Sequence, residues 1–104
     1  MSEFKKFDQG KPKFSLIPPK ALRLVAHIFT MGEKKYGAYN HMKGTDWVRY
    51  WDAASRHMNS WLDQEDLDPE SMKNHLAHAI ASLMIELEMI LRDKGTDNRY
   101  KDEE

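Results

Sequence analysis

Apolar residues recur at helical spacing in three stretches of the chain, and segments rich in glycine, proline or charge separate the three. The first stretch starts at Pro19, which suits the first turn of a helix, and ends at Gly32, which favours a helix stop. Between these two residues the apolar positions follow the helical period: Ala21, Leu22, Leu24, Val25, Ile28 and Phe29. This pattern predicts a first helix.

The second stretch predicts a helix over about 46–63. Thr45 or Asp46 can cap its N-terminus. Asp52 and Arg56 stand one turn apart, so they either pair with each other on the surface or leave Arg56 to contact a phosphate. The apolar side of this helix is an aromatic stripe, which we expect to lie in the core: Trp47, Tyr50, Trp51, Ala54, Met58, Trp61 and Leu62.

The third stretch begins with a strong helix-start signal, since Asp68 is a suitable N-cap, Pro69 suits the first position and Glu70 faces the positive end of the helix dipole. We expect this helix to run to about Arg92. Apolar residues cover almost all of its circumference: Met72, Leu76, Ala79, Ile80, Leu83, Ile85, Leu87, Met89 and Ile90. A helix with two buried faces predicts a dimer or a higher oligomer.

The other segments carry no sustained apolar period. We expect a flexible arm over residues 1–10, and an extended segment over 11–19 that lies along the domain, because residues before proline avoid the helical region. A structured loop is expected over 33–44, and a charged tail with a frayed end over 93–104. Residues 11–92 then form a single helical domain.

Together these segments predict an all-α protein, a small bundle of three main helices plus an extended N-terminal segment, completed by oligomerisation to a dimer or tetramer. A chain of 104 residues can form only one modest core, so self-association would help it. Its formal net charge of -1 gives no general attraction to a nucleic acid polymer. The 32% of charged residues exclude a membrane protein, and no signal-peptide-like run is seen, so we expect a cytoplasmic protein.

A row of polar side chains interrupts the apolar third helix. His75 and His78 are three positions apart, and Ser82 and Glu86 continue the same face at four-residue steps. Buried polar groups cost free energy unless they are paired or bind something. Either each imidazole hydrogen-bonds a neighbouring carboxylate or carbonyl across the helix interface, or these histidines form a functional centre with His57 of the preceding helix.

Carboxylates in the turn between the second and third helices fit two kinds of metal chemistry. In the first, Glu65 and Asp68, with Glu70 as a further candidate, hold Mg²⁺, a hard cation that prefers carboxylate oxygen. In the second, histidines and carboxylates together bind zinc, manganese or iron, because imidazole suits these ions. Cysteine is absent, so any metal must use nitrogen or oxygen ligands.

The expected loop over 33–44 holds three lysines, two tyrosines and Asn40. It is either an ordinary connector with surface lysines or a platform for an anionic ligand. In the second interpretation, ammonium groups hold phosphate, a tyrosine ring stacks on a base, and the asparagine amide makes polar contacts.

Several short motifs follow one another along most of the chain: KPKFSLIP at 11–18, GEKKYG at 32–37 with Asn40, Arg56-His57 with Trp61, Glu65 with DPES at 68–71, and HLAH at 75–78. Their ordered combination resembles the dATP/dGTP diphosphohydrolase N-terminal family, small helical proteins found largely in phages and similar to the MazG-like nucleotide pyrophosphohydrolases. The family usually has glycine where this chain has Gln64 and Met72, and tryptophan where it has His41.

The resemblance implies a deoxypurine nucleotide ligand and hydrolysis between its α and β phosphates, with Mg²⁺ or Mn²⁺ as the cofactor. It implies a polar centre made by six residues: Arg56, His57, Glu65, Asp68, His75 and His78. Within this centre our hypothesis makes His57, Glu65, His75 and His78 catalytic and makes Glu65 and Asp68 the metal ligands. The nucleotide contacts that it implies, carried over by position, come from Lys11, Lys34, Lys35, Tyr36, Asn40 and Arg56. If a phage encodes the protein, the expected location is the host-cell cytoplasm.

Three functional hypotheses follow from the sequence. The first is a nucleoside triphosphate pyrophosphohydrolase that serves phage nucleotide metabolism. The second is a non-catalytic protein of the same fold that sequesters a nucleotide, as a phage might use against host defence. The third gives the apolar helix face a role in oligomerisation only, and it predicts no thermal shift on addition of a ligand.

Overall fold

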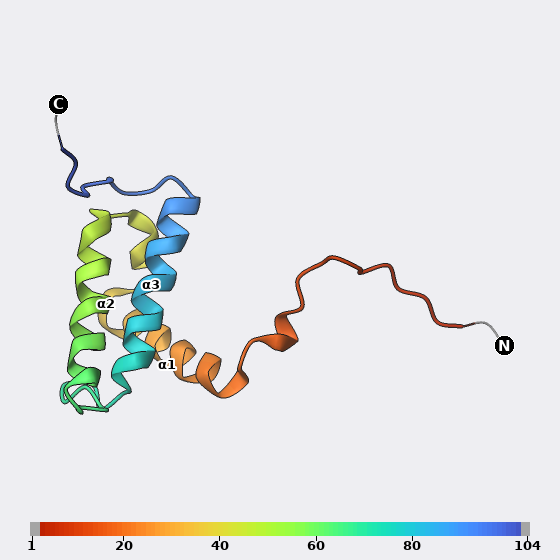
Figure 1. Ribbon diagram of the computed structural model, residues 1–104, viewed down its shortest axis with the longest axis horizontal. Helices are drawn as coiled ribbons and strands as arrows, with labels where there is room; N and C mark the ends of the chain where they lie inside the picture. The colour runs from red at the N-terminus through yellow and green to blue at the C-terminus, as the bar shows by residue number, and fades with distance from the viewer. Residues whose placement is uncertain (1–2, 103–104) are drawn as a thin grey trace.

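Three helices and two short 3₁₀ turns follow one another in the computed structural model, which describes residues 3–102 (Figure 1). In chain order they are η1 (Phe14–Leu16), α1 (Pro19–Tyr36), η2 (Asn40–Lys43), α2 (Trp47–Leu62) and α3 (His75–Leu91). Residues 3–102 contain isolated bridges but no strand. The expected all-α fold with three main helices is therefore confirmed. None of the described helices is long and apolar enough to cross a membrane.

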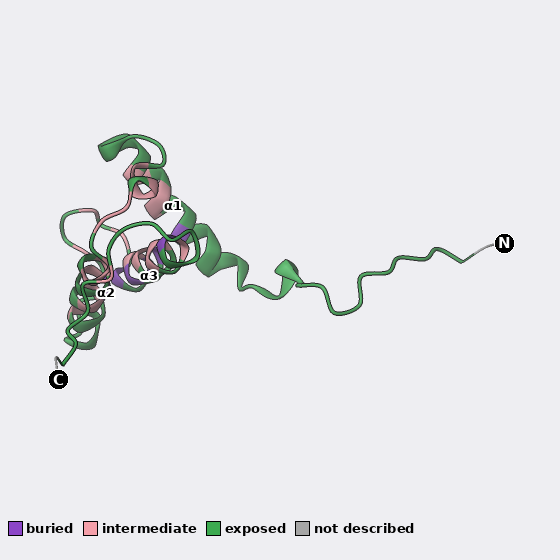
Figure 2. Cartoon of the chain, turned by 90° about the horizontal axis from the view of Figure 1, so that it is seen from above, coloured by how far each residue is buried: buried purple, intermediate pink, exposed green. Residues whose placement is uncertain are grey.

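Helices α2 and α3 run antiparallel to each other, and α1 lies against α3 (Figures 1 and 2). The side chains buried between the helices are mostly small: Val25, Ala54, Ala77, Ala79, Ala81 and Met89. Such side chains let helix axes approach closely, because the distance between packed helices depends on the residues at the contact. No large side chain of the described residues is fully buried, so a single chain has only a thin core.

Large apolar side chains remain exposed on all three helices. Exposed residues, green in Figure 2, make up most of the chain that the structure describes. Four residues of the aromatic stripe are exposed: Trp51 by 55%, Met58 by 36%, Trp61 by 44% and Leu62 by 75%. The expectation that the whole stripe lies in the core is therefore wrong for these four residues. Leu83, Leu87 and Ile90 form part of an exposed apolar face on α3. The second buried face of this helix therefore stays a prediction that requires a partner.

Helix α3 begins at His75, not at Asp68 as the sequence analysis expects. Residues 68–72 make a single tight turn instead, in which the N–H of Met72 donates to the carbonyl of Asp68 at 2.7 Å. Met72 has a φ of 61°, and this left-handed conformation stops the helix after one turn. A bridge between Leu67 and Asn74 closes the segment and folds its acidic side chains back toward the first turn of α3.

Helix α1 continues through Gly32 to Tyr36, so the expectation of a loop over 33–44 is wrong for its first residues. A single glycine inside an apolar helical pattern is tolerated when the surrounding residues favour the helix. The helix ends at Gly37, which has a φ of 91° and donates its N–H to the carbonyl of Glu33 at 2.8 Å. The following turn, η2, brings Asn40 back over the body of the protein.

The segment after α3 binds the start of α2. The carbonyl of Thr96 accepts the N–H of Trp47 at 3.0 Å, and Oδ1 of Asn98 accepts the N–H of Val48 at 3.0 Å. The indole of Trp47 also donates to the carbonyl of Lys94 at 2.8 Å. The expectation of a frayed end is therefore wrong for residues 94–98, while residues 103–104 lie outside the described part of the chain.

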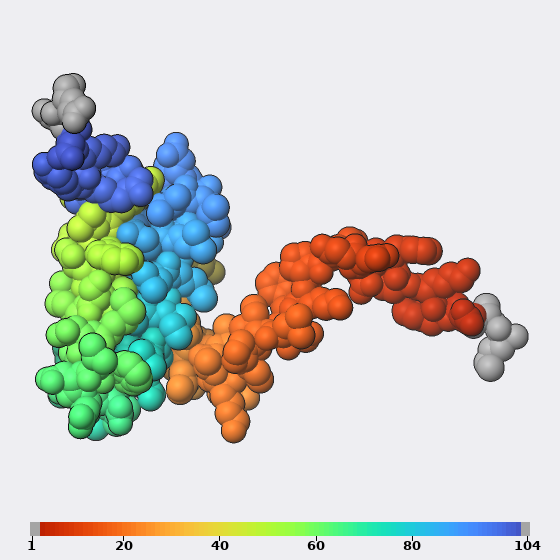
Figure 3. All heavy atoms as spheres, in the orientation of Figure 1, coloured from red at the N-terminus to blue at the C-terminus, as the bar shows by residue number. Residues whose placement is uncertain are grey.

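Residues 3–18 extend away from the helices (Figures 1 and 3). Phe4, Phe7 and Phe14 are 90%, 85% and 77% exposed, so they pack against little of the described part of the chain. The expected extended N-terminal segment is confirmed, but the expectation that it lies along the domain is wrong. Residues 1–2 of the expected arm lie outside the described part.

Candidate functional site

Three histidines and two carboxylates meet where α2 ends and α3 begins. His57 projects from α2, His75 and His78 from the first turn of α3, and Glu65 and Asp68 from the connecting turn. The tight turn after Asp68 allows this arrangement, because it folds the acidic segment back onto the helix start. The structure thus places together five of the six residues predicted for the polar centre, all except Arg56.

The two ring nitrogens of His75, a buried residue, have different partners. Nε2 lies 2.7 Å from Oε1 of Glu65, and Nδ1 lies 2.9 Å from Nδ1 of His57. An ionised carboxylate only accepts hydrogen bonds, so the proton of a neutral His75 belongs on Nε2. The Nδ1 lone pair of His75 then faces His57. A carboxylate that fixes the tautomer in this way is the usual support of a metal-binding histidine.

His78 connects the acidic turn to both helices. Its Nε2 lies 2.7 Å from Oγ of Ser71 and 3.8 Å from Oδ2 of Asp68. The same Asp68 oxygen accepts the backbone N–H of Ser71 at 3.0 Å. The His78 ring stacks on His57, with ring centroids 4.5 Å apart and planes inclined by 8°. These contacts hold the two imidazoles and the turn in one arrangement.

His57, Asp68 and His75 are placed to hold one metal ion. Each offers a ligand atom, and these atoms all lie within 4.8 Å of one another. Two imidazoles and one carboxylate suit manganese, iron or zinc better than magnesium, which prefers oxygen ligands. Glu65, which the sequence analysis expects as a ligand, lies outside this set of three and hydrogen-bonds His75 instead. The donor set therefore fits a divalent transition metal, with Glu65 as its support.

Burial adjusts the pKa values of this cluster. It lowers the pKa of His57, and the charges of the neighbouring His78 and His75 lower it further. Burial likewise lowers the pKa of His78, against the opposing effect of Asp68. For Asp68, burial alone would raise the pKa, but hydrogen bonds from Ser71 and the nearby histidines outweigh it and lower the pKa. Neutral imidazoles and an ionised carboxylate are the protonation states that bind metal.

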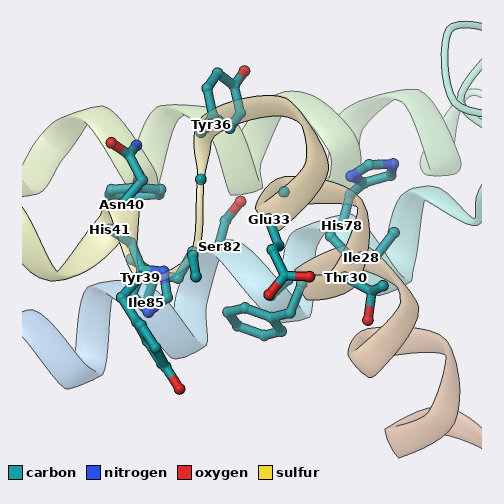
Figure 4. A pocket seen from close by; sticks show the side chains of 16 residues that line it. Ile28, Thr30, Glu33, Tyr36, Tyr39, Asn40, His41, His78, Ser82 and Ile85 are labelled. Carbon is teal, nitrogen blue, oxygen red and sulfur yellow. The ribbon is translucent and has the colours of Figure 1, made fainter.

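A hollow of about 390 Å³ opens beside the cluster (Figure 4), and we call it the α1–α3 hollow. His78 belongs both to the cluster and to the wall of this hollow. The volume lies in the range of small-molecule sites. Its other walls combine apolar, aromatic and polar side chains, including Ile28, Phe29, Glu33, Tyr36, Tyr39, Asn40, His41, Tyr50, Ser82 and Ile85.

A second hollow, of about 450 Å³, lies between α2 and the segment that follows α1, and we call it the α2 hollow. Four residues line both hollows: Tyr36, Asn40, His41 and Tyr50. The remaining wall of the α2 hollow comes from Lys43, Gly44, Thr45, Arg49, Ala53 and Arg56. The two hollows are thus neighbours that share an aromatic and polar wall.

The residues predicted to contact nucleotide are only partly brought together. Tyr36 and Asn40 line both hollows, and Arg56 lines the α2 hollow. Lys11, on the N-terminal segment, and Lys34 line neither hollow.

Lys35 also lines neither hollow, but its ammonium group lies 3.6 Å from a carboxylate oxygen of Glu70 in the acidic turn. It lies 5.2 Å from the centroid of the Tyr36 ring as well. Both groups raise the pKa of Lys35, the tyrosine more than the glutamate. Lys35 therefore links the end of α1 to the turn that carries the histidine cluster.

Sequence reasoning missed several residues of the two hollows. Arg49 and Arg56 are seven positions apart on α2, so helical periodicity alone could have placed them on one face. His41 and Tyr50 carried no comparable signal, because their positions depend on how the segment after α1 folds over α2. Ser71, which hydrogen-bonds His78, belongs to the DPES motif, but the sequence predicted no contact for its side chain.

Comparison with known proteins agrees with this arrangement. The family described as dATP/dGTP diphosphohydrolase, N-terminal, matches residues 2–99. The chain belongs to this family. The "dATP/dGTP diphosphohydrolase" of Salmonella phage PMBT28 is 37% identical to it over 94 residues, which cover 90% of this chain. The chain spans only 32% of the length of that relative. No solved structure matches the chain.

Two residues of the turns that fold the acidic segment have a left-handed backbone without being glycine. They are Gln64 and Met72, with φ angles of 71° and 61°. Left-handed backbone costs little for glycine and more for residues with a Cβ atom. The two turns therefore keep a conformation that local sequence alone would not favour.

Proposed function

We propose that this chain binds a deoxypurine nucleoside triphosphate, such as dATP or dGTP, and hydrolyses it to the monophosphate and pyrophosphate with a divalent metal ion. One observation carries the proposal: the potential metal ligands His57, Asp68 and His75 lie beside a ligand-sized hollow, and His78, whose ring stacks on His57, lines that hollow. A nucleotide in the hollow would therefore reach the cluster. A nucleotide substrate would also place the activity in the cytoplasm, that of the host cell if a phage encodes the protein.

The relationship to known proteins supports this substrate class. The family and the phage relative both carry the name dATP/dGTP diphosphohydrolase. The 37% identity extends over nearly all of this chain but over less than a third of the relative's length. The activity of that whole protein is therefore part of the proposal here.

His57, Asp68 and His75 would hold the metal ion, and their donor atoms favour Mn²⁺ over Mg²⁺. When bound, the ion supplies positive charge to the phosphates and lowers the pKa of a coordinated water. Glu65 keeps the His75 proton on Nε2 and so directs the Nδ1 lone pair toward His57.

The reaction transfers the α-phosphoryl group to water. The water oxygen forms a bond to the α phosphorus, and the bond from that phosphorus to the α–β bridging oxygen breaks, so pyrophosphate leaves with the electron pair. His78 is the residue of the cluster that lines the hollow, and its neutral imidazole would accept the proton of the water. Ser71 holds this imidazole in place through its hydroxyl group.

The α1–α3 hollow suits the base and sugar. Phe29 and His41 already make an edge-to-face contact there, with ring centroids 5.8 Å apart, and Tyr39 adds a further aromatic ring to the wall. Aromatic rings bind a flat base by stacking. Asn40 supplies an amide for polar contact with base edges, a group that can both donate and accept hydrogen bonds.

The proposal includes association of two or more copies, as a dimer or tetramer. The core of one chain contains few large apolar side chains, whereas Leu83, Leu87 and Ile90 on α3 stay exposed. Burial of apolar area is the main favourable term in such association. Light scattering coupled to size-exclusion chromatography tests this part: a mass above that of one 12.2 kDa chain supports it, and a monomer at micromolar concentration contradicts it.

Product analysis tests the proposed activity. The purified protein is incubated with dATP, dGTP and the other nucleoside triphosphates, with Mn²⁺, with Mg²⁺ and with a chelator, and the products are separated by ion-exchange chromatography. We expect monophosphate and pyrophosphate only with metal. Intact nucleotide that stays bound to the protein, and returns unchanged after denaturation, would contradict hydrolysis and favour sequestration. No binding and no thermal shift would contradict both functions.

A further inference from the structure

We propose that the α2 hollow binds the phosphate chain of the nucleotide, with Lys43, Arg49 and Arg56 as its anion-binding side chains. This inference rests on the proposed function and adds to it the position and orientation of the substrate. The base and sugar would occupy the α1–α3 hollow, and the phosphates would extend along the shared wall into the α2 hollow.

The lining of the α2 hollow carries positive charge and no opposing charge. Three positive charges come from Lys43, Arg49 and Arg56, and none of the lining residues is aspartate or glutamate. The remaining lining residues are neutral at pH 7 by type, apart from His41, which can only add positive charge. A concave surface with one sign of charge concentrates counter-ions of the opposite sign.

The two arginines of this hollow have no carboxylate partner in the described part of the chain. Within residues 3–102, neither Arg49 nor Arg56 forms an ion pair, although Arg92 and Arg99 both do. In particular, Arg56 does not pair with Asp52, one of the two roles that the sequence left open for it. Guanidinium groups that lack a carboxylate partner keep their donors available for phosphate oxygens.

The helix itself presents these donors on one face. Arg49, Ala53 and Arg56 follow at four-residue and three-residue steps along α2, so they line one side of the helix. The small Ala53 side chain leaves space between the two guanidinium groups. A phosphate group placed over Ala53 could then receive hydrogen bonds from both arginines.

The position of the arginines along α2 fits a single substrate. Arg56 and His57 are consecutive residues, so the cationic side chains and the histidine cluster lie at the same level of the helix, on faces about 100° apart. Tyr36, Asn40 and Tyr50 line both hollows, which therefore share part of their walls. A nucleotide that spans both hollows would thus place its α phosphate near the cluster and its outer phosphates beside the arginines.

The test uses inorganic tripolyphosphate and deoxyadenosine as separate probes of the two hollows. Isothermal titration calorimetry measures the Kd of each probe for the wild type, for the Arg49→Gln/Arg56→Gln double variant and for Arg23→Gln. Arg23 is an exposed arginine on α1 that lines neither hollow, so it is a matched control for the loss of positive charge.

We expect the double variant to raise the Kd of tripolyphosphate at least about tenfold, because hydrogen bonds between charged groups are among the strongest. The Kd of deoxyadenosine should stay the same, and Arg23→Gln should change neither value. Unchanged tripolyphosphate binding in the double variant would overturn the inference, as would an equal loss of both probes.

Kinetics with dATP separates a failure of this inference from a failure of the proposed function. If the wild type hydrolyses dATP and the double variant keeps the same KM, the α2 hollow does not hold the phosphates while the activity stands. If tripolyphosphate binding depends on the two arginines but dATP stays intact, the phosphate site stands and the proposed hydrolysis fails.

Discussion

Nδ1 of His57 and Nδ1 of His75 lie 2.9 Å apart, although the two residues are 18 positions apart in the chain. The contact depends on the turn between α2 and α3, which folds back at Met72 and lets Glu65 reach the far side of the His75 ring. Two ring nitrogens at this distance either share one proton or direct both lone pairs toward a cation. The supporting carboxylate favours the cation.

Replacing His57 by alanine should weaken Mn²⁺ binding by at least about 100-fold, because it removes one ligand and not only a support. Helical content should hardly change, since His57 is only half buried. Calorimetric titration with Mn²⁺ measures the first effect and far-ultraviolet circular dichroism the second. His27→Ala, on the exposed side of α1, is the matched control and should bind Mn²⁺ like the wild type.

Replacing Glu65 by glutamine should weaken Mn²⁺ binding by about 10- to 100-fold, less than the loss of a ligand. Glutamine can still accept a hydrogen bond from His75 Nε2, but its neutral amide no longer fixes the tautomer as strongly. The same calorimetric titration ranks the two variants. Asp63→Asn removes an exposed carboxylate nearby and should have no effect. If Glu65→Gln weakens Mn²⁺ binding as much as His57→Ala does, Glu65 is itself a metal ligand.

Replacing Met72 by glycine should stabilise the protein by about 0.5–1 kcal/mol. The residue has a φ of 61°, which costs about 1–2 kcal/mol for a residue with a Cβ atom, and the greater freedom of glycine in the unfolded chain offsets part of this gain. Urea unfolding measures the change. Met72→Ala keeps the strained backbone and removes a mostly exposed side chain, so it should bring little or no gain. Equal stabilisation by both variants would contradict backbone strain as the cause.

Replacing Glu86 by glutamine should stabilise the protein at pH 7 by about 1 kcal/mol, because the neutral amide removes a negative charge that burial disfavours. Oε2 of Glu86 is buried without a hydrogen-bond partner among the described residues. Burial raises the pKa of Glu86 above its ordinary value of 4.5. Below pH 4.5 the carboxyl is protonated in both the folded and the unfolded chain and brings no cost. The cost grows as pH rises from 4.5 to the raised pKa and is complete above it, so the gain should vanish in acid.

Thermal unfolding at pH 4 and at pH 7 measures this difference. Glu88→Gln serves as the control, because the Glu88 carboxylate pairs with Arg92 one turn away. Replacing Glu88 by glutamine should therefore not stabilise the protein at either pH. A stabilisation by Glu86→Gln that is equal at both pH values would show that the ionised carboxylate is not its source.

The sequence was sufficient to predict the three helices, because they rest on local signals. Apolar periodicity placed α2 to within one residue at each end, and the spacing of His75 and His78 put them on one face. The turn between the helices was less predictable. Asp68 and Pro69 do start a helical turn, as predicted, but Met72 ends it after one turn because it adopts a left-handed conformation. That conformation is expected of glycine and not of methionine.

Features that depend on distant parts of the chain could not be predicted from local pattern. Trp47 binds Lys94 through its indole, a contact between residues 47 positions apart. The α2 hollow arises because the segment after α1 folds over α2 and brings Lys43 near Arg49. No periodicity encodes such a contact. The prediction that the aromatic stripe lies in the core was wrong for a related reason. Trp51 and Trp61 are apolar, but no other segment of the described chain covers them.

The most direct test of the central claim compares dATP hydrolysis by the wild type, His57→Ala and His27→Ala, each with Mn²⁺ and with a chelator. The account predicts dAMP and pyrophosphate from the wild type and from His27→Ala with Mn²⁺, no product with chelator, and a rate at least about 100-fold lower for His57→Ala. Product formation that persists with chelator, or that His57→Ala leaves unchanged, would contradict a metal centre at His57, Asp68 and His75.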